Sequence, residues 1–198
     1  MRLYGRRFWP SLALGIGPAA GGVALTRLPG YWQLAFAMLA GGVIATASYI
    51  GATAIAAGVP LERRRVATAL LAGALVFLPV PFLVNLFILP AVAWLGLVGL
   101  VVPVAVIEGL GLRAAFRRAF ALARADPLHA VGGLATLAIV GLLTTWVLFF
   151  LLRGQGDATL AAAGLLAVLV VSPLLFLGSA LLYFDQAARV VESRRRRR

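Results

Sequence analysis

The feature of this chain that most constrains its fold is a series of long apolar blocks that contain no Asp, Glu, Lys or Arg. Each block has about 17–27 residues, and a helix of that length crosses a hydrocarbon core of about 30 Å at 1.5 Å per residue. The blocks are continuously apolar rather than alternating, which favours helices over the strands of a membrane barrel. The sequence therefore predicts an all-α membrane protein.

Six transmembrane helices are predicted when the apolar blocks are divided at Arg, Gly, Pro or Asp. They cover about residues 8–26, 31–57, 66–89, 91–107, 128–152 and 158–184. Short connections arrange them as three hairpins in a single polytopic membrane domain over residues 1–190, followed by a basic cytoplasmic tail over 191–198. Residues 66–107 have to turn back within one apolar stretch, and Asn85 with Pro90 marks the expected break.

The composition agrees with this class. Hydrophobic residues make up 63% of the chain and charged residues 12%, whereas soluble domains have about 45–50% and about 25%. The chain thus lacks the polar residues that would cover a soluble globule. There is no cysteine and a single histidine, His129, so the sequence predicts no disulfide, metal or other cofactor.

The arginines predict an orientation. All 18 basic residues are arginine, and 16 of them fall on one side of the membrane when the N-terminus is placed in the cytoplasm. The other side receives only Arg27 and Arg153. Because cytoplasmic loops carry the basic excess, both termini are expected inside. Arginine without lysine, in a chain rich in Ala, Gly, Leu and Val, is typical of a GC-rich genome, which suggests the plasma membrane of a bacterium.

The first span leaves an alternative open. Its basic start, short apolar stretch and small residues are also compatible with a cleaved signal peptide. A retained helix is favoured because another span follows almost at once. A second alternative is that the third predicted span is a re-entrant segment that does not cross the membrane. The later arginine-bearing segments would then no longer all fall on the cytoplasmic side.

Residues 111–125 are predicted to form an amphipathic helix on the cytoplasmic side. At 100° per residue, three arginines share one side: Arg113, Arg117 and Arg124. Apolar residues occupy the opposite side: Leu112, Ala115, Phe116, Ala119 and Leu122. Such a helix can lie in the headgroup plane with its arginines on anionic lipid. The alternative is a structural connector between the fourth and fifth spans.

Two carboxylates, Glu108 and Asp185, stand near the cytoplasmic ends of the fourth and sixth spans. Carboxylates in a membrane are costly and therefore mark candidate sites. Each has arginine within reach, namely Arg189 four residues after Asp185 and the group at 113–118 after Glu108, so ion pairing is expected. The alternative is a proton or substrate site. His129 is expected at the interface, with a pH switch as its alternative.

Three short segments carry a family resemblance: residues 103–109 (PVAVIEG), 112–118 (LRAAFRR) and 182–185 (LYFD), the last followed by Arg189. They resemble the membrane domain of bacterial glycerophosphoryl diester phosphodiesterases, modules of which also occur as stand-alone uncharacterised proteins. Five residues match recurring positions: Glu108, Arg117, Arg118, Tyr183 and Asp185. In that family catalysis belongs to a separate soluble barrel, for which this chain has neither the length nor the residues.

The sequence predicts no enzyme, because it contains no nucleophile constellation, phosphate loop or metal motif. The favoured function is a non-catalytic membrane scaffold or accessory subunit with a basic cytoplasmic surface for anionic lipid or a protein partner. Nucleic acid is not expected, since no folded reading surface accompanies the arginines. A small transporter or channel, with a site near Glu108, Asp185 or Asn85, is the alternative, followed by an intramembrane enzyme acting on lipid.

Overall fold

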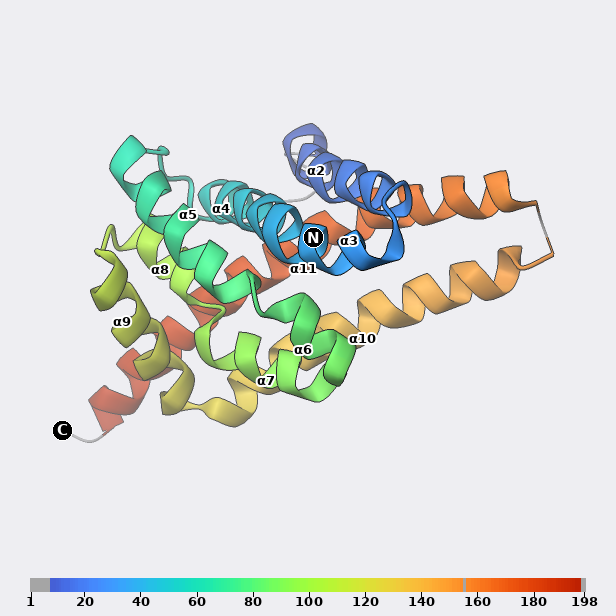
Figure 1. Cartoon of the computed structure of the whole chain (residues 1–198). Helices are drawn as coiled ribbons and strands as arrows, with labels where there is room; N and C mark the ends of the chain where they lie inside the picture. The colour runs from blue at the N-terminus through green and yellow to red at the C-terminus, as the bar shows by residue number, and fades with distance from the viewer. Residues whose placement is uncertain (1–7, 155, 197–198) are drawn as a thin grey trace.

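The computed structural model describes residues 8–154 and 156–196, which fold into helices joined by short connections (Figure 1). In chain order these are α2 (Phe8–Thr26), α3 (Gly30–Phe36), the π-helical turn η1 (Ala37–Gly41), α4 (Gly42–Ala57), α5 (Arg63–Phe77), α6 (Val80–Leu86), α7 (Ile88–Val98), α8 (Val101–Ile107), α9 (Leu112–Ala125), α10 (Pro127–Leu152) and α11 (Asp157–Arg196). The predicted all-α class is confirmed.

Five stretches of the described chain are long and apolar enough to cross a membrane. They are Gly30–Ala57, Arg63–Leu86, Ile88–Ile107, Pro127–Leu152 and Ala161–Glu192, and they correspond to the second to sixth predicted spans. The first predicted span is a helix as well, α2, with Pro18 inside it, but it is not among the five. Five of the six predicted spans therefore coincide with candidate membrane spans of the structure.

The turn predicted within residues 66–107 lies where the sequence placed it. Phe87, two residues after Asn85, has extended backbone angles of φ −169° and ψ 146° and separates α6 from α7. A smaller break precedes it at Pro79, which lacks the backbone N–H that would continue α5. The indole N–H of Trp94 then donates to the carbonyl of Val76 at 2.8 Å, which ties α7 back to α5.

The last helix is longer than its membrane span. α11 has 40 residues, which corresponds to about 60 Å, or about twice the thickness of the hydrocarbon core. It continues past the predicted span end at residue 184 and through the predicted tail as far as Arg196; residues 197–198 lie outside the described chain. The loss of apolar character after residue 184 therefore does not mark the end of the helix.

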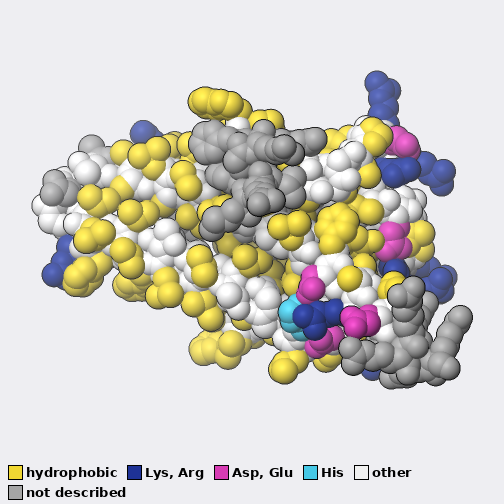
Figure 2. Space-filling model, turned by 180° about the vertical axis from the view of Figure 1, so that it is seen from behind, with side chains coloured by type: hydrophobic (Ala, Val, Ile, Leu, Met, Phe, Trp, Pro, Cys, Tyr) yellow, Lys and Arg dark blue, Asp and Glu magenta, His cyan; other side chains and the backbone are white. Residues whose placement is uncertain are grey.

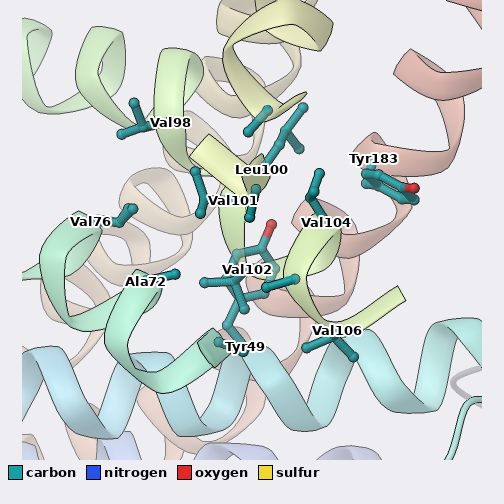
Figure 3. Packing of buried hydrophobic residues seen from close by; sticks show 14 of the residues in the cluster. Tyr49, Ala72, Val76, Val98, Leu100, Val101, Val102, Val104, Val106 and Tyr183 are labelled. Carbon is teal, nitrogen blue, oxygen red and sulfur yellow. The ribbon is translucent and has the colours of Figure 1, made fainter. Parts of the chain in front are cut away.

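The hydrophobic core surrounds α8, in which Val101, Val102, Val104 and Val106 have no exposed surface (Figure 3). Helices α4, α5 and α9 pack around α8. Helix α10 lies on the outside of the bundle. Only 6% of its most apolar 18-residue stretch is buried, whereas 50% is buried in the span that contains α8. The outer parts of α10 and α11 project beyond the other helices as an antiparallel hairpin (Figure 1).

Helix α2 packs closely against both α4 and α11. The hydroxyl of Ser48 on α4 donates to the carbonyl of Leu14 at 2.9 Å. Gly15 is fully enclosed at the crossing with α11, where a Cβ atom would lie 2.1 Å from the carbonyl oxygen of Leu169. A glycine is required at this close approach because no side chain fits.

Candidate functional site

The charged side chains gather at one end of the molecule. This charged end is formed by the turn from α4 into α5, by α9 and by the C-terminal part of α11. Figure 2 shows dark blue, magenta and cyan side chains together at this end and a few dark blue ones at the opposite end. Arg153 lies at the opposite end, in the turn between α10 and α11. The segregation matches the predicted distribution of arginine.

Glu108 caps the C-terminus of α8 and joins three helices. The Nε–H of Arg118 on α9 donates to both carboxylate oxygens of Glu108, at 3.1 and 3.3 Å. The buried hydroxyl of Tyr183 on α11 donates to Oε1 at 2.8 Å. Gly109, at φ 65°, turns the chain out of α8 toward α9 and so allows the arginine to fold back onto the carboxylate. The part-buried carboxylate thereby connects α8 to α9 and α11.

A second cluster links the start of α10 to α11 through Asp185. Its Oδ2 accepts the Nε–H of Arg189 at 3.1 Å, one helical turn on, and contacts Nε2 of His129. Asp126 caps α10, because its Oδ1 accepts the backbone N–H of His129 at 3.1 Å. Its Oδ2 lies 3.5 Å from Nη1 of Arg189. Four side chains that are partly open to solvent thus form a continuous chain of contacts.

Helix α9 is the predicted amphipathic helix, one residue shorter at its start. Its arginine side, with Arg113, Arg117 and Arg124, is exposed, and the Arg124 guanidinium lies 5.3 Å from the centre of the Phe120 ring. The opposite side is buried against the protein core, with Ala115, Ala119 and Leu122 fully enclosed. Because protein covers the apolar side, that side of α9 is not available to insert into lipid, which favours the alternative of a structural connector between the fourth and fifth spans.

Four arginines at the charged end make neither an ion pair nor an aromatic contact with the described residues. They are Arg63, Arg64, Arg113 and Arg117, all exposed, and together they are called the basic surface below. Arg65 connects the two halves of this surface. It pairs with Glu62 at 3.2 Å, and its guanidinium lies about 3.5 Å from the Cβ position of Gly109, which places the start of α5 beside the turn into α9.

The structure divides the residues singled out from the sequence among three places. Glu108, Arg118 and Tyr183 meet in one cluster, Asp185 and Arg189 meet in another, and Arg117 points outward with the basic surface. The ion pairs expected for both carboxylates are present. Sequence reasoning missed the contact between His129 and Asp185, which are 56 residues apart. No local spacing could have revealed it.

Three cavities in the helical bundle have apolar walls. None of them is lined by Glu108, Asp185 or Asn85, the residues considered for a transport site. Asn85 lies exposed next to the turn at Phe87. Among the described residues, no group of three or more His, Asp or Glu side chains is arranged to hold a metal ion.

The helical spans and the charged end together define a multi-pass membrane protein. No protein-family model matches the chain, and no curated protein or solved structure matches it either. The resemblance to the phosphodiesterase membrane domain therefore stays a prediction.

Proposed function

We propose that this chain is a non-catalytic membrane scaffold or accessory subunit of the bacterial plasma membrane that holds anionic lipid on its basic surface. The observation that carries the proposal is that the charged end contains both paired carboxylates and arginines without an acidic partner. The carboxylates of Glu108 and Asp185 each pair with an arginine of the same chain. The four arginines of the basic surface have no acidic partner among the described residues and face outward.

The energetics favour lipid as the partner of this surface. A basic side chain near an anionic leaflet contributes roughly 1 kcal/mol of attraction, so four together contribute several kcal/mol. Three consecutive arginines, 63–65, stand in the first turn of α5, where the positive end of the helix dipole makes cations unfavourable and an anion favourable. A lipid phosphate offsets this repulsion. The positive charge of the basic surface would also suit a protein partner with an acidic surface.

The transporter alternative has less support. A transport site needs at least two polar side chains around one water-accessible cavity at membrane depth. Glu108 and Asp185 instead face arginines at the charged end, and the three cavities described above are apolar. Two carboxylates held by ion pairs are suited to fixing helix positions rather than to carrying a substrate.

We also propose that α2 is a retained first span, which gives six spans with both termini in the cytoplasm. Its hydrogen bond from Ser48 and its close crossing with α11 at Gly15 support this topology. A segment packed so closely against two other helices belongs to the folded bundle. The proposed kinship with the phosphodiesterase membrane domain would add no catalytic activity to this scaffold.

The test of lipid binding compares melting temperatures in nanodiscs of phosphatidylcholine with and without phosphatidylglycerol. We expect phosphatidylglycerol to raise the melting temperature of the unaltered protein, and a doubly substituted Arg113→Gln, Arg117→Gln variant to lose most of that rise. Arg153→Gln, at the opposite end, is the matched control and should keep it. Equal stabilisation of both variants would contradict lipid binding at the basic surface. Added salt should weaken the effect, because these charges are exposed.

A further inference from the structure

A cavity of about 210 Å³ lies between α7, α10 and α11 and is closed on one side by Tyr49 of α4 and Phe77 of α5. Its remaining wall is almost entirely apolar, with Leu95, Leu134 and Leu175 among the residues that line it. The cavity exceeds the roughly 150 Å³ at which an apolar cavity in a protein core binds a molecule the size of benzene. The cavity lies among the candidate membrane spans, so lipids are the molecules nearest to the helices that enclose it.

Two hydroxyl groups interrupt the apolar wall, and neither has a hydrogen-bond partner among the described residues. Tyr49 is 97% enclosed, with a relative exposure of 3%, and in Figure 3 its side chain rises from α4 into the core with the oxygen at its far end. Ser179 lines the same cavity. Other hydroxyls on these helices satisfy themselves: Ser172 and Thr145 each donate to the carbonyl four residues earlier.

A hydroxyl that faces an apolar cavity without a partner is less favourable than one with a hydrogen bond. Small-molecule sites have this composition: they are mostly apolar, with a small number of polar groups that fix the orientation of the ligand. A second cavity, of about 280 Å³, shares the Phe77 and Phe176 walls but is lined by no hydroxyl-bearing residue. The polar group of a ligand is therefore expected in the first cavity, next to Tyr49.

We infer that this cavity binds the apolar chain of a membrane amphiphile, and that the Tyr49 hydroxyl hydrogen-bonds to the oxygen that the chain carries. The oxygen belongs to a hydroxyl or an ester group, because both accept from a phenol and fit an otherwise apolar wall. Ser179 is the second hydroxyl available to the same oxygen. This site is separate from the basic surface. The inference therefore does not depend on the proposed function, and a negative result for lipid binding at the basic surface would not contradict it.

Photochemical labelling in phosphatidylcholine nanodiscs tests the inference. Three diazirine probes are used: hexadecanol, hexadecane, and phosphatidylcholine with the diazirine in one acyl chain. We expect hexadecanol or the phospholipid to label residues 130–138 of α10 and 175–182 of α11. Labelling by hexadecanol alone would assign the site to a free amphiphile, and labelling by the phospholipid would assign it to an acyl ester. Either result supports the inference.

Two substitutions separate the cavity from the lipid-facing surface. Ala138→Phe fills the cavity and should lower labelling of these segments by about fivefold or more. Ile139→Phe, on the exposed side of α10, is the matched control and should leave labelling unchanged. Leu134→Phe serves as a second filling variant if the first does not give a cooperative melt. Labelling that stays the same after the cavity is filled would overturn the site.

Tyr49→Phe tests the hydrogen bond while keeping the ring. Loss of one hydrogen bond of about 1 kcal/mol corresponds to about a fivefold loss of occupancy. We expect that loss for the oxygen-bearing probe that labels the site and no loss for hexadecane. An equal response of all probes would overturn the assigned role of Tyr49.

Discussion

Glu108 holds three helices together, because one carboxylate accepts hydrogen bonds from Arg118 on α9 and from Tyr183 on α11. Glu108→Ala leaves the buried tyrosine hydroxyl and the arginine without an acceptor, so we expect a loss of about 2–3 kcal/mol in the free energy of unfolding. Chemical unfolding in detergent micelles measures it. Arg117→Ala, an exposed neighbour on α9, is the control and should stay within about 0.5 kcal/mol. Similar losses in both variants would argue against a special role for Glu108.

The carboxylate of Asp185 also pairs with an arginine, but its environment is different. Its side chain and that of Arg189 are each 47% exposed, against 24% for Glu108. Water screens an exposed ion pair, so Asp185→Ala is expected to lower the free energy of unfolding by clearly less than Glu108→Ala in the same measurement. A loss as large as that of Glu108→Ala would show that the contact with His129 is stronger than exposure suggests.

Residue-level prediction succeeded where partners are close in sequence. Arg189 follows Asp185 by one helical turn, so spacing indicated this pair, and for Glu108 it indicated the arginine group at 113–118, of which Arg118 makes the contact. The partner that buries the Glu108 cluster, Tyr183, is 75 residues away. That contact depends on how α11 packs against α8 and α9, which periodicity does not encode.

At the scale of elements, the crossing of α2 and α11 depends on one glycine. Alanine is normally better than glycine inside a helix by about 0.5–1 kcal/mol, but a Cβ at Gly15 would lie 2.1 Å from a backbone oxygen of α11. We therefore expect Gly15→Ala to lower the melting temperature and Gly22→Ala to leave it unchanged or raise it. Nothing lies within 4 Å of the Cβ position of Gly22, which makes it the matched control. Equal effects would contradict the close crossing.

The elements that the sequence predicted well are those with a strong local signal. The period of 3.6 located α9, and the apolar block after Asp126 and Pro127 located the start of α10, where the aspartate caps the helix. The length of α11 was missed, because charge and hydropathy report where lipid ends rather than where hydrogen bonding ends. The π-helical turn Ala37–Gly41 also has no specific sequence signal, since four of its five residues are good helix formers and it lies in a continuous apolar span.

For the whole molecule, the arrangement of arginines gives an orientation that single-cysteine labelling can measure. The chain has no native cysteine, so each introduced thiol reports alone. Gly154, in the turn between α10 and α11, and Gly111, in the turn before α9, are exposed with open space around the Cβ position. We expect a membrane-impermeant maleimide to label Gly154→Cys in intact cells, at least about tenfold faster than Gly111→Cys, because the basic end stays inside.

Permeabilising the membrane completes that measurement. Gly111→Cys should then react as fast as Gly154→Cys, since both positions are equally open in the folded protein. The opposite pattern in intact cells would place the basic surface outside. It would also contradict the proposed function as stated, because that proposal places the basic surface on the cytoplasmic leaflet. Both the predicted orientation of the bundle and the proposed function of its basic surface therefore depend on the same distribution of arginine.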